Sequence, residues 1–69
     1  MFDNIKVGDT LKRVRNGFNG EKEKWDAKVI ELTENEIVCE VVVDILRTMK
    51  FSRRTGVNIY GSAYGWLEQ

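Results

Sequence analysis

The cationic and aromatic side chains of residues 45–61 are the best candidates for chemistry in this sequence. The segment reads ILRTMKFSRRTGVNIYG, and Met49 and Phe51 lie two residues apart on one face of an extended chain. Its four cations are Arg47, Lys50, Arg53 and Arg54. Because guanidinium groups bind phosphates and carboxylates well, this basic strand is the first candidate binding site.

The sharp turn at residues 54–56 gives this site a specific form. Arg53, Arg54 and the backbone N–H groups around Gly56 could together hold a phosphate or a carboxylate. The alternative is that these arginines are solvated cations on an edge strand, where charge discourages pairing with other chains. Both interpretations remain open at the level of the sequence.

The aromatic side chains are a second set of candidates. They are Phe18, Trp25, Phe51, Tyr60, Tyr64 and Trp66. Some of them could form a platform for a nucleic-acid base or anchor a protein interface. We expect Trp25 and Phe51 to fill the core instead. Tyr64 and Trp66 lie in a glycine-rich tail and are expected to be partly exposed, and Phe18 is a contact candidate at a loop tip.

No catalytic or metal-binding constellation is present in the sequence. Histidine is absent, and the single cysteine, Cys39, lies in an apolar strand pattern that predicts a buried thiol. The acidic residues Glu34 and Glu36 flank a turn without the spacing of a calcium loop. We therefore expect a non-enzymatic protein with no catalytic residues, no metal site and no cofactor.

The charge is balanced in total but unevenly distributed along the chain. Lysine and arginine number 11, as do aspartate and glutamate, yet residues 1–20 and 45–69 are basic while residues 21–44 are acidic. If the two flanks meet in the fold, Arg13 and Arg15 join the basic strand in one positive face. The neutral total argues against a duplex-DNA binder but leaves a local anion site open.

Five short strands are expected to carry these groups. Residues 10–15, 25–33 and 37–44 form the first three, and the fourth leads through the basic turn into a return strand over residues 57–60. Apolar residues change face within 10–15 and within 25–33, which predicts a bulge or bend in each. Residues 16–24 read as a long polar loop, and Phe2, Ile5 and Val7 are expected to plug one end.

This pattern predicts one all-β domain over residues 1–69, a small five-stranded antiparallel SH3-like barrel with a glycine- and aromatic-rich tail at 61–69. An OB-like barrel is the alternative, although it usually needs a longer chain and a helix. The start of the chain shows neither a signal peptide nor an apolar spanning run. Together with the lone cysteine, this predicts a cytoplasmic protein that does not enter the membrane.

Two resemblances add to this interpretation. Val7-Gly8-Asp9, the glycine-bearing loop at 17–20 and the acidic turn at 34–36 resemble the KOW-type SH3-like domain, whose members contact ribosomes or transcription factors. A longer loop and Glu23-Lys24-Trp25 replace that family's glycine before the second strand. The second half, with Phe51-Ser-Arg-Arg-Thr-Gly56, is similar to small β-barrel proteins of bacteriophages, which implies a phage or mobile-element origin.

Three hypotheses of function follow. The first is a non-enzymatic interaction module, of phage or mobile-element origin, that binds a host protein. The second is a module that binds nucleic acid or a small nucleotide through the basic and aromatic strand at residues 47–56. The third, an enzyme, has the least support in the sequence. The small size of the domain also favours self-association to form a homo-oligomer.

Overall fold

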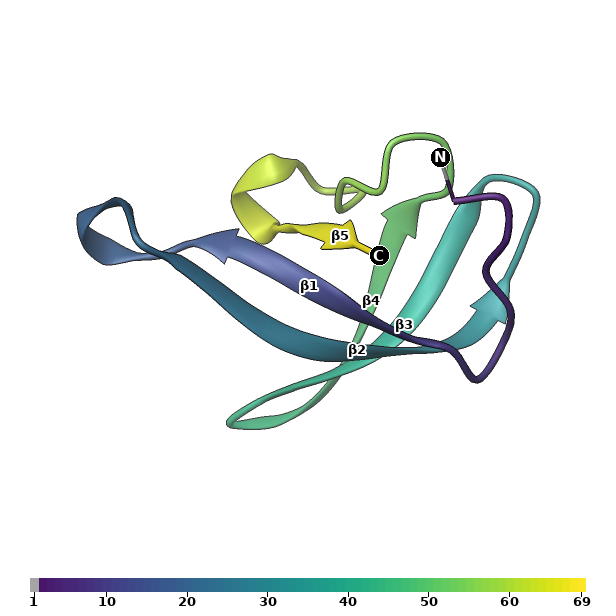
Figure 1. Cartoon of the computed structure of the whole chain (residues 1–69), viewed down its shortest axis with the longest axis horizontal. Coiled ribbons are helices and arrows are strands. Elements are labelled where there is room, and N and C mark those ends of the chain that lie inside the picture. The colour runs from purple at the N-terminus through teal and green to yellow at the C-terminus, as the bar shows by residue number, and fades with distance from the viewer. Residues whose placement is uncertain (1) are drawn as a thin grey trace.

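The computed structural model describes residues 2–69 and contains one antiparallel sheet with the strand order β4-β3-β2-β1-β5 (Figure 1). The strands are β1 (Thr10–Asn16), β2 (Lys22–Leu32), β3 (Glu36–Val43), β4 (Ile45–Ser52) and β5 (Trp66–Glu68). Two three-residue 3-10 turns, η1 (Phe18–Gly20) and η2 (Ser62–Tyr64), precede β2 and β5. The predicted all-β class with five antiparallel strands is confirmed.

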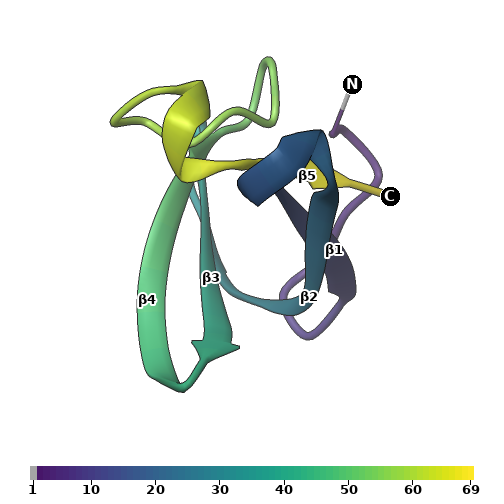
Figure 2. The same cartoon turned by 90° about the vertical axis from the view of Figure 1, so that its left-hand side faces the viewer.

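The sheet curls without closing into a barrel. Seen end-on, β3 and β4 form one side of a U, β1 and β2 form the other, and η2 and β5 span the open top (Figure 2). The predicted return strand at 57–60 is present only as two isolated bridges, Phe51↔Asn58 and Val57↔Trp66. The fifth strand lies instead at Trp66–Glu68, where Leu67 is buried against the core. Leu67 thus anchors the tail, and Trp66 beside it is partly exposed, as predicted.

The β1–β2 hairpin is longer and more regular than its sequence suggests. Its register runs without interruption from Thr10↔Lys28 to Asn16↔Lys22, so no bulge lies within residues 10–15, where the change of face predicts a bulge or a bend. Val14 lies on the face opposite Leu11, next to its pairing partner Trp66 of β5, and it is completely buried. This burial explains why an apolar residue occupies that face. The predicted loop at 16–24 shortens to a tip around η1, since strand pairing continues to Lys22.

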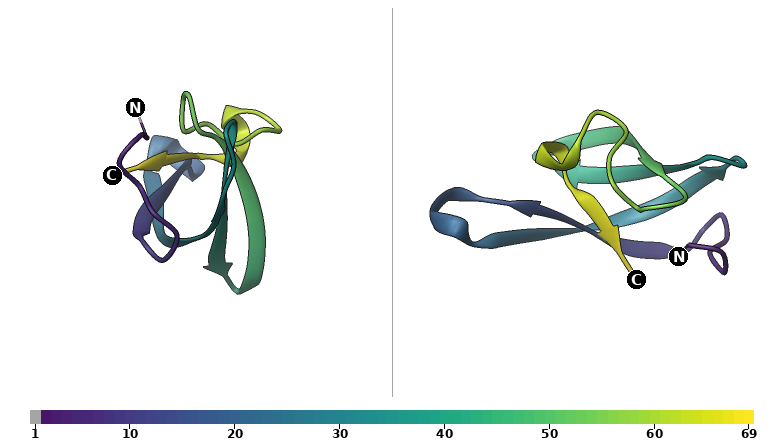
Figure 3. Two further views of the ribbon diagram at one scale, coloured as in Figure 1. Left: turned by 90° about the vertical axis from the view of Figure 1, so that its right-hand side faces the viewer. Right: turned by 90° about the horizontal axis from the view of Figure 1, so that it is seen from above.

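The bulge predicted within residues 25–33 is confirmed. The register of β2 with β3 shifts between Val29 and Glu31, where the apolar residues of β2 change face. Such a bulge bends its strand and increases the local twist. In the views from the side and from above, β2 bends between its two partners and brings the two hairpins to face each other (Figure 3).

The core fills the inside of this curl. Ile37, Cys39 and Val41 of β3 and Phe51 of β4 are completely buried, as the period-two pattern predicts. Trp25 and Met49 are only partly buried and pack against its margin. Of the three residues expected to plug one end, Ile5 is buried and Phe2 packs on the core. Val7 is 61% exposed, so that part of the prediction is wrong. Val7 lies in the turn that Asp9 closes by accepting the Lys6 N–H, which leaves its side chain outside.

The Cys39 thiol gives a test of this packing. Burial raises the pKa of Cys39 from its ordinary 9.0 to about 11. The folded protein should therefore react very slowly with a thiol reagent at pH 8, and at the rate of a free thiol in denaturant. Because the pKa is higher in the folded state, this group costs stability as pH rises from 9 towards 11. Fast labelling of the native protein would contradict the buried position.

Candidate ligand-binding groove

A groove lies between β1 and β4 on the inner side of the curled sheet. Two adjoining hollows of about 280 and 350 Å³ share Arg13, Arg47, Met49 and Tyr64, and we call them together the arginine groove. At one end the lining is completed by Arg15, Val43 and Asp44, and at the other by Thr48, Lys50, Asn58 and Tyr60. The groove therefore has a cationic end and an aromatic end.

The alternation of two distant strands places the cations in this groove. Arg13 and Arg15 face inward with Leu11 because they pair directly with Trp25 and Glu23 of β2. Arg47 faces inward because it pairs with the buried Val41. Although β1 and β4 are separated by two strands in the sheet, the curl brings their inner faces together. The basic flanks of the sequence thus meet, as the charge pattern suggested.

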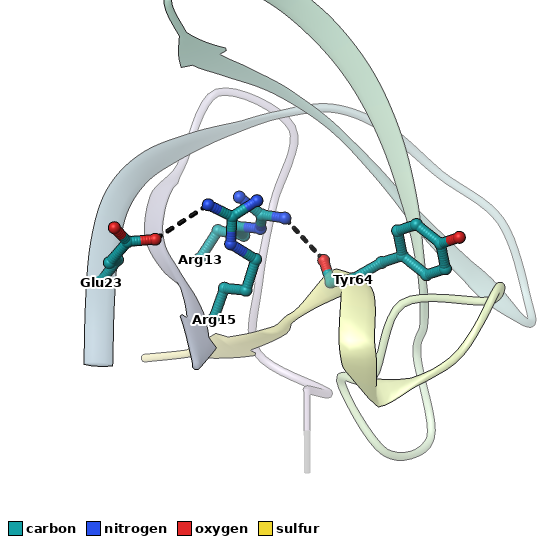
Figure 4. A network of polar contacts seen from close by, with 4 residues as sticks. All are labelled: Arg13, Arg15, Glu23 and Tyr64. Carbon is teal, nitrogen blue, oxygen red and sulfur yellow. Dashed lines mark hydrogen bonds and ion pairs between the residues drawn. The ribbon is translucent and has the colours of Figure 1, made fainter. Parts of the chain in front are cut away.

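Arg13 occupies the deepest position in the groove. Its side chain is only 2% exposed, and its Nη2 donates a hydrogen bond of 2.7 Å to the Tyr64 carbonyl (Figure 4). Its Nε and Nη1 atoms are buried and have no hydrogen-bond partner among residues 2–69. Its guanidinium carbon lies 5.0 Å from the centre of the Trp25 ring, which gives a cation–π contact. Arg13 is thus held in place with two donors unused.

Arg15 lies beside Arg13, but its positive charge is balanced by an ion pair with Glu23. Its Nη2 donates to Glu23 Oε1 at 2.8 Å, and its guanidinium carbon lies 5.1 Å from the Trp25 ring centre. Figure 4 shows the two guanidinium groups next to each other, one directed to Glu23 and the other to the Tyr64 carbonyl. The ion pair is partly exposed, so its contribution to stability is small.

The field in the groove favours an anion. Loss of water on burial lowers the pKa of Arg13, the neighbouring charge of Arg15 lowers it further, and Glu23 partly opposes both effects. A buried cation without an acidic contact costs on the order of several kcal/mol. Among the described residues, no carboxylate forms an ion pair with Arg13 or Arg47. An anionic group between them would offset that cost.

The aromatic end is formed by two exposed tyrosines. The rings of Tyr60 and Tyr64 meet edge to face, with their centres 6.5 Å apart, and they are 80% and 57% exposed. The Tyr64 ring points away from the two arginines although its carbonyl accepts from Arg13 (Figure 4). Asn58, which is nearly buried, holds the turn by accepting the Tyr60 N–H at its Oδ1. Planar groups could stack on this end.

The other half of the basic segment lies elsewhere. Arg53 is used structurally, because its Nη1 donates to the Thr33 carbonyl at 2.9 Å and its Nε to the Phe2 carbonyl at 3.4 Å. The backbone N–H groups of Arg54 and Gly56 are also used, by the Ser52 hydroxyl and the Ser52 carbonyl. Since these donors are engaged within the turn, the anion site predicted around Gly56 lacks free N–H groups there.

The remaining candidate residues are spread over the molecule. Phe18 is 94% exposed at the tip of the β1–β2 hairpin, so it does not cap the core. Trp66 is partly buried and lies on the outer face of the sheet beside Val14. Lys22 Nζ lies 5.9 Å from the centre of the Trp66 ring. Lys50 lines the aromatic end of the groove. The structure therefore brings together Arg13, Arg15, Arg47, Lys50 and Tyr64, and leaves Arg53, Arg54, Phe18 and Trp66 outside.

Sequence reasoning missed two residues of this site. The sequence predicts Glu23 in a loop, but the longer hairpin places it opposite Arg15. It predicts Asn58 in a return strand, because a polar residue between Val57 and Ile59 fits the alternation of a strand. The observed position of each residue depends on contacts between distant segments, which local sequence patterns do not show.

No protein-family model, no curated protein and no solved structure matches this chain. Within residues 2–69 there is also no cluster of three or more acidic, histidine or cysteine side chains suited to a metal ion. The same part of the chain has no helix with the length and hydropathy needed to cross a bilayer. The groove must therefore be interpreted from its own chemistry.

Substitutions of the two glycines that flank η2 test how closely the tail approaches β1 beside the groove. Gly61 and Gly65 both have backbone angles that only glycine readily adopts, with φ of +122° and +102°. A Cβ at Gly65 would lie 2.6 Å from the Val14 carbonyl oxygen and 2.7 Å from Arg13 Nε, whereas one at Gly61 would meet nothing within 4 Å. Gly61→Ala should therefore cost about 1–3 kcal/mol through strain alone.

Gly65→Ala should carry the same strain and also force the tail away from β1 and Arg13. We expect a clearly larger loss of unfolding free energy than for Gly61→Ala, measured by urea denaturation of both variants in parallel. Equal losses would mean that the tail does not approach β1 as closely as the structure has it.

Proposed function

We propose that this chain is a non-enzymatic binding module whose arginine groove takes a nucleotide or a short single strand of nucleic acid. The observation that carries the proposal is the convergence of Arg13, Arg15 and Arg47 beside the exposed Tyr60 and Tyr64. Guanidinium groups match the phosphate, and tyrosine rings offer a stacking surface that tolerates any base. Both kinds of contact come from one groove.

The charge balance supports a small or single-stranded ligand over duplex DNA. Proteins that bind duplex DNA tightly neutralise many phosphates and usually carry a strong basic excess, whereas this chain has a formal net charge of zero. A groove of a few hundred Å³ also lies near the lower end of the range for small-molecule sites.

Binding by the groove can be separated from binding by the basic turn with two arginine variants. Arg47 lines the groove and Arg54 lies outside it, and both are exposed. Arg47→Ala should weaken binding of a fluorescein-labelled short oligothymidylate about fivefold to tenfold, measured by anisotropy at low salt. Arg54→Ala, which removes the same charge, should change the affinity by less than about twofold.

The affinity of the wild-type protein should also fall as salt is raised, because phosphate contacts release counterions. The proposal is wrong if neither the oligonucleotide nor adenosine monophosphate binds the wild-type protein. It is also wrong if Arg54→Ala has the larger effect, since the basic turn would then be the site.

A second candidate function is supported by an exposed apolar tip. Val42, Ile45 and Leu46 are each about 60% exposed where β3 turns into β4. β4 is an edge strand, and among residues 2–69 no strand pairs with its outer side between Ile45 and Met49. Exposed apolar residues beside an unpaired edge are typical of surfaces that add a partner's strand. This observation favours a module that binds a partner protein.

Under this second candidate the chain is an SH3-like module of phage or mobile-element origin that binds a host protein in the cytoplasm. The KOW-like and phage-like sequence features support that origin, and the curled five-stranded sheet is compatible with it. The same edge could instead pair with a second copy of the chain, which would make a homo-oligomer.

Two lysine substitutions separate these outcomes. Leu46→Lys should abolish nuclease-resistant capture of a protein from bacterial lysate, because it places a charge on the apolar tip. Val7→Lys changes an equally exposed residue outside this tip and should leave capture intact. If both variants capture the same protein equally well, the tip is not the contact surface. A change in the mass of the purified wild-type protein with concentration would identify self-association.

A further inference from the structure

Arg13 is the buried cation of the groove, and two of its nitrogen atoms lack hydrogen-bond acceptors among the described residues. It is nearly fully buried, yet no atom of residues 2–69 accepts a hydrogen bond from its Nε or Nη1. Glu23 pairs with Arg15, and the Tyr64 carbonyl accepts only from Nη2. Buried donors are normally satisfied, so an unused pair calls for an explanation.

We infer that Arg13 is the anchor of a phosphate subsite and that the groove takes a nucleoside monophosphate by its terminal phosphate. This inference rests on the proposed function and names its ligand class. The phosphate lies among Arg13, Arg15 and Arg47, and the base lies on Tyr60 and Tyr64 at the other end of the groove. Arg47 and Tyr64, which are both exposed, line the two hollows beside Arg13 where the phosphate enters.

The charges favour a terminal phosphate over one within a strand. Arg15 is paired with Glu23, whereas Arg13 and Arg47 form no ion pair within the described part of the chain. A terminal phosphate carries close to two negative charges at neutral pH, while a phosphate inside a strand carries one. The dianion therefore matches the two uncompensated cations. Asp44, the acid that lines the cationic end, is exposed and forms no ion pair with Arg13 or Arg47 among the described residues.

Trp25 and the tail explain how the site is kept ready without its ligand. The Trp25 ring lies 5.0 Å and 5.1 Å from the guanidinium carbons of Arg13 and Arg15, so it supports both cations. The Tyr64 carbonyl fixes the direction of Arg13, and Gly65 lets the chain pass close to it. The donors are therefore ordered before binding, which reduces the entropy lost when the ligand binds.

The test compares adenosine, adenosine monophosphate and inorganic phosphate on wild-type protein and on Arg13→Met, Arg13→Lys and Arg54→Met. Isothermal titration calorimetry gives the affinities, and thermal unfolding gives the stabilisation that each compound confers. On the wild-type protein the monophosphate should bind at least tenfold more tightly than adenosine. It should also raise the melting temperature, as inorganic phosphate should at higher concentration.

Arg13→Met should lose roughly 10- to 100-fold in affinity for the monophosphate, a clearly larger loss than for adenosine, so the preference for the monophosphate shrinks. Arg13→Lys, which keeps the charge without the planar fork, should fall between. Arg54→Met should behave as the wild type. If adenosine binds the wild-type protein as well as the monophosphate does, the phosphate subsite is refuted while the proposed function stands.

If the wild-type protein binds none of the three compounds and does not bind the oligothymidylate, the proposed function itself is refuted. An oligothymidylate with no terminal phosphate that binds more tightly than adenosine monophosphate would overturn the assignment to a terminal phosphate. If Arg13→Met does not fold, the comparison of the three compounds on the wild-type protein still decides the inference.

Discussion

The hydrogen bond from Arg13 to the Tyr64 carbonyl joins the first strand to the C-terminal tail, and the groove depends on this contact. It ties η2, which carries Tyr64, to the inner face of β1 beside the cations. The close approach of Gly65 to Val14 and the pairing of β5 with β1 support the same junction. The site is thus built by the tail returning to the start of the sheet.

This arrangement places an ionic group where an apolar one would be expected. Arg13 lies on the same face as Leu11, next to a core of aliphatic side chains, and replaces an apolar residue in the strand pattern. A cation at such a position usually costs stability unless it is paired. Positions that break a local rule in this way are often functional, because binding can make up for the cost.

Period-two patterning was enough to predict the strands, the bulge in β2 and the burial of Cys39 and Phe51, because all of these depend on neighbours along the chain. The same reasoning predicts the fifth strand at 57–60, which is wrong because β5 pairs with β1, far away in sequence. It leaves open whether Arg53 and Arg54 bind an anion or are solvated cations, and the hydrogen bonds of Arg53 to the Thr33 and Phe2 carbonyls also depend on distant segments. Composition did suggest that the basic flanks meet, but it could not show that Arg13 is buried between them.

The most direct test of this account is to record which backbone amides of the uniformly 15N-labelled protein shift when adenosine monophosphate is added. We predict saturable shifts in β1 around Arg13, in β4 around Arg47 and in the tail from Asn58 to Gly65, with residues 53–56 unaffected. Shifts confined to the turn at 53–56, or none at saturating ligand, would contradict the arginine groove as the binding site.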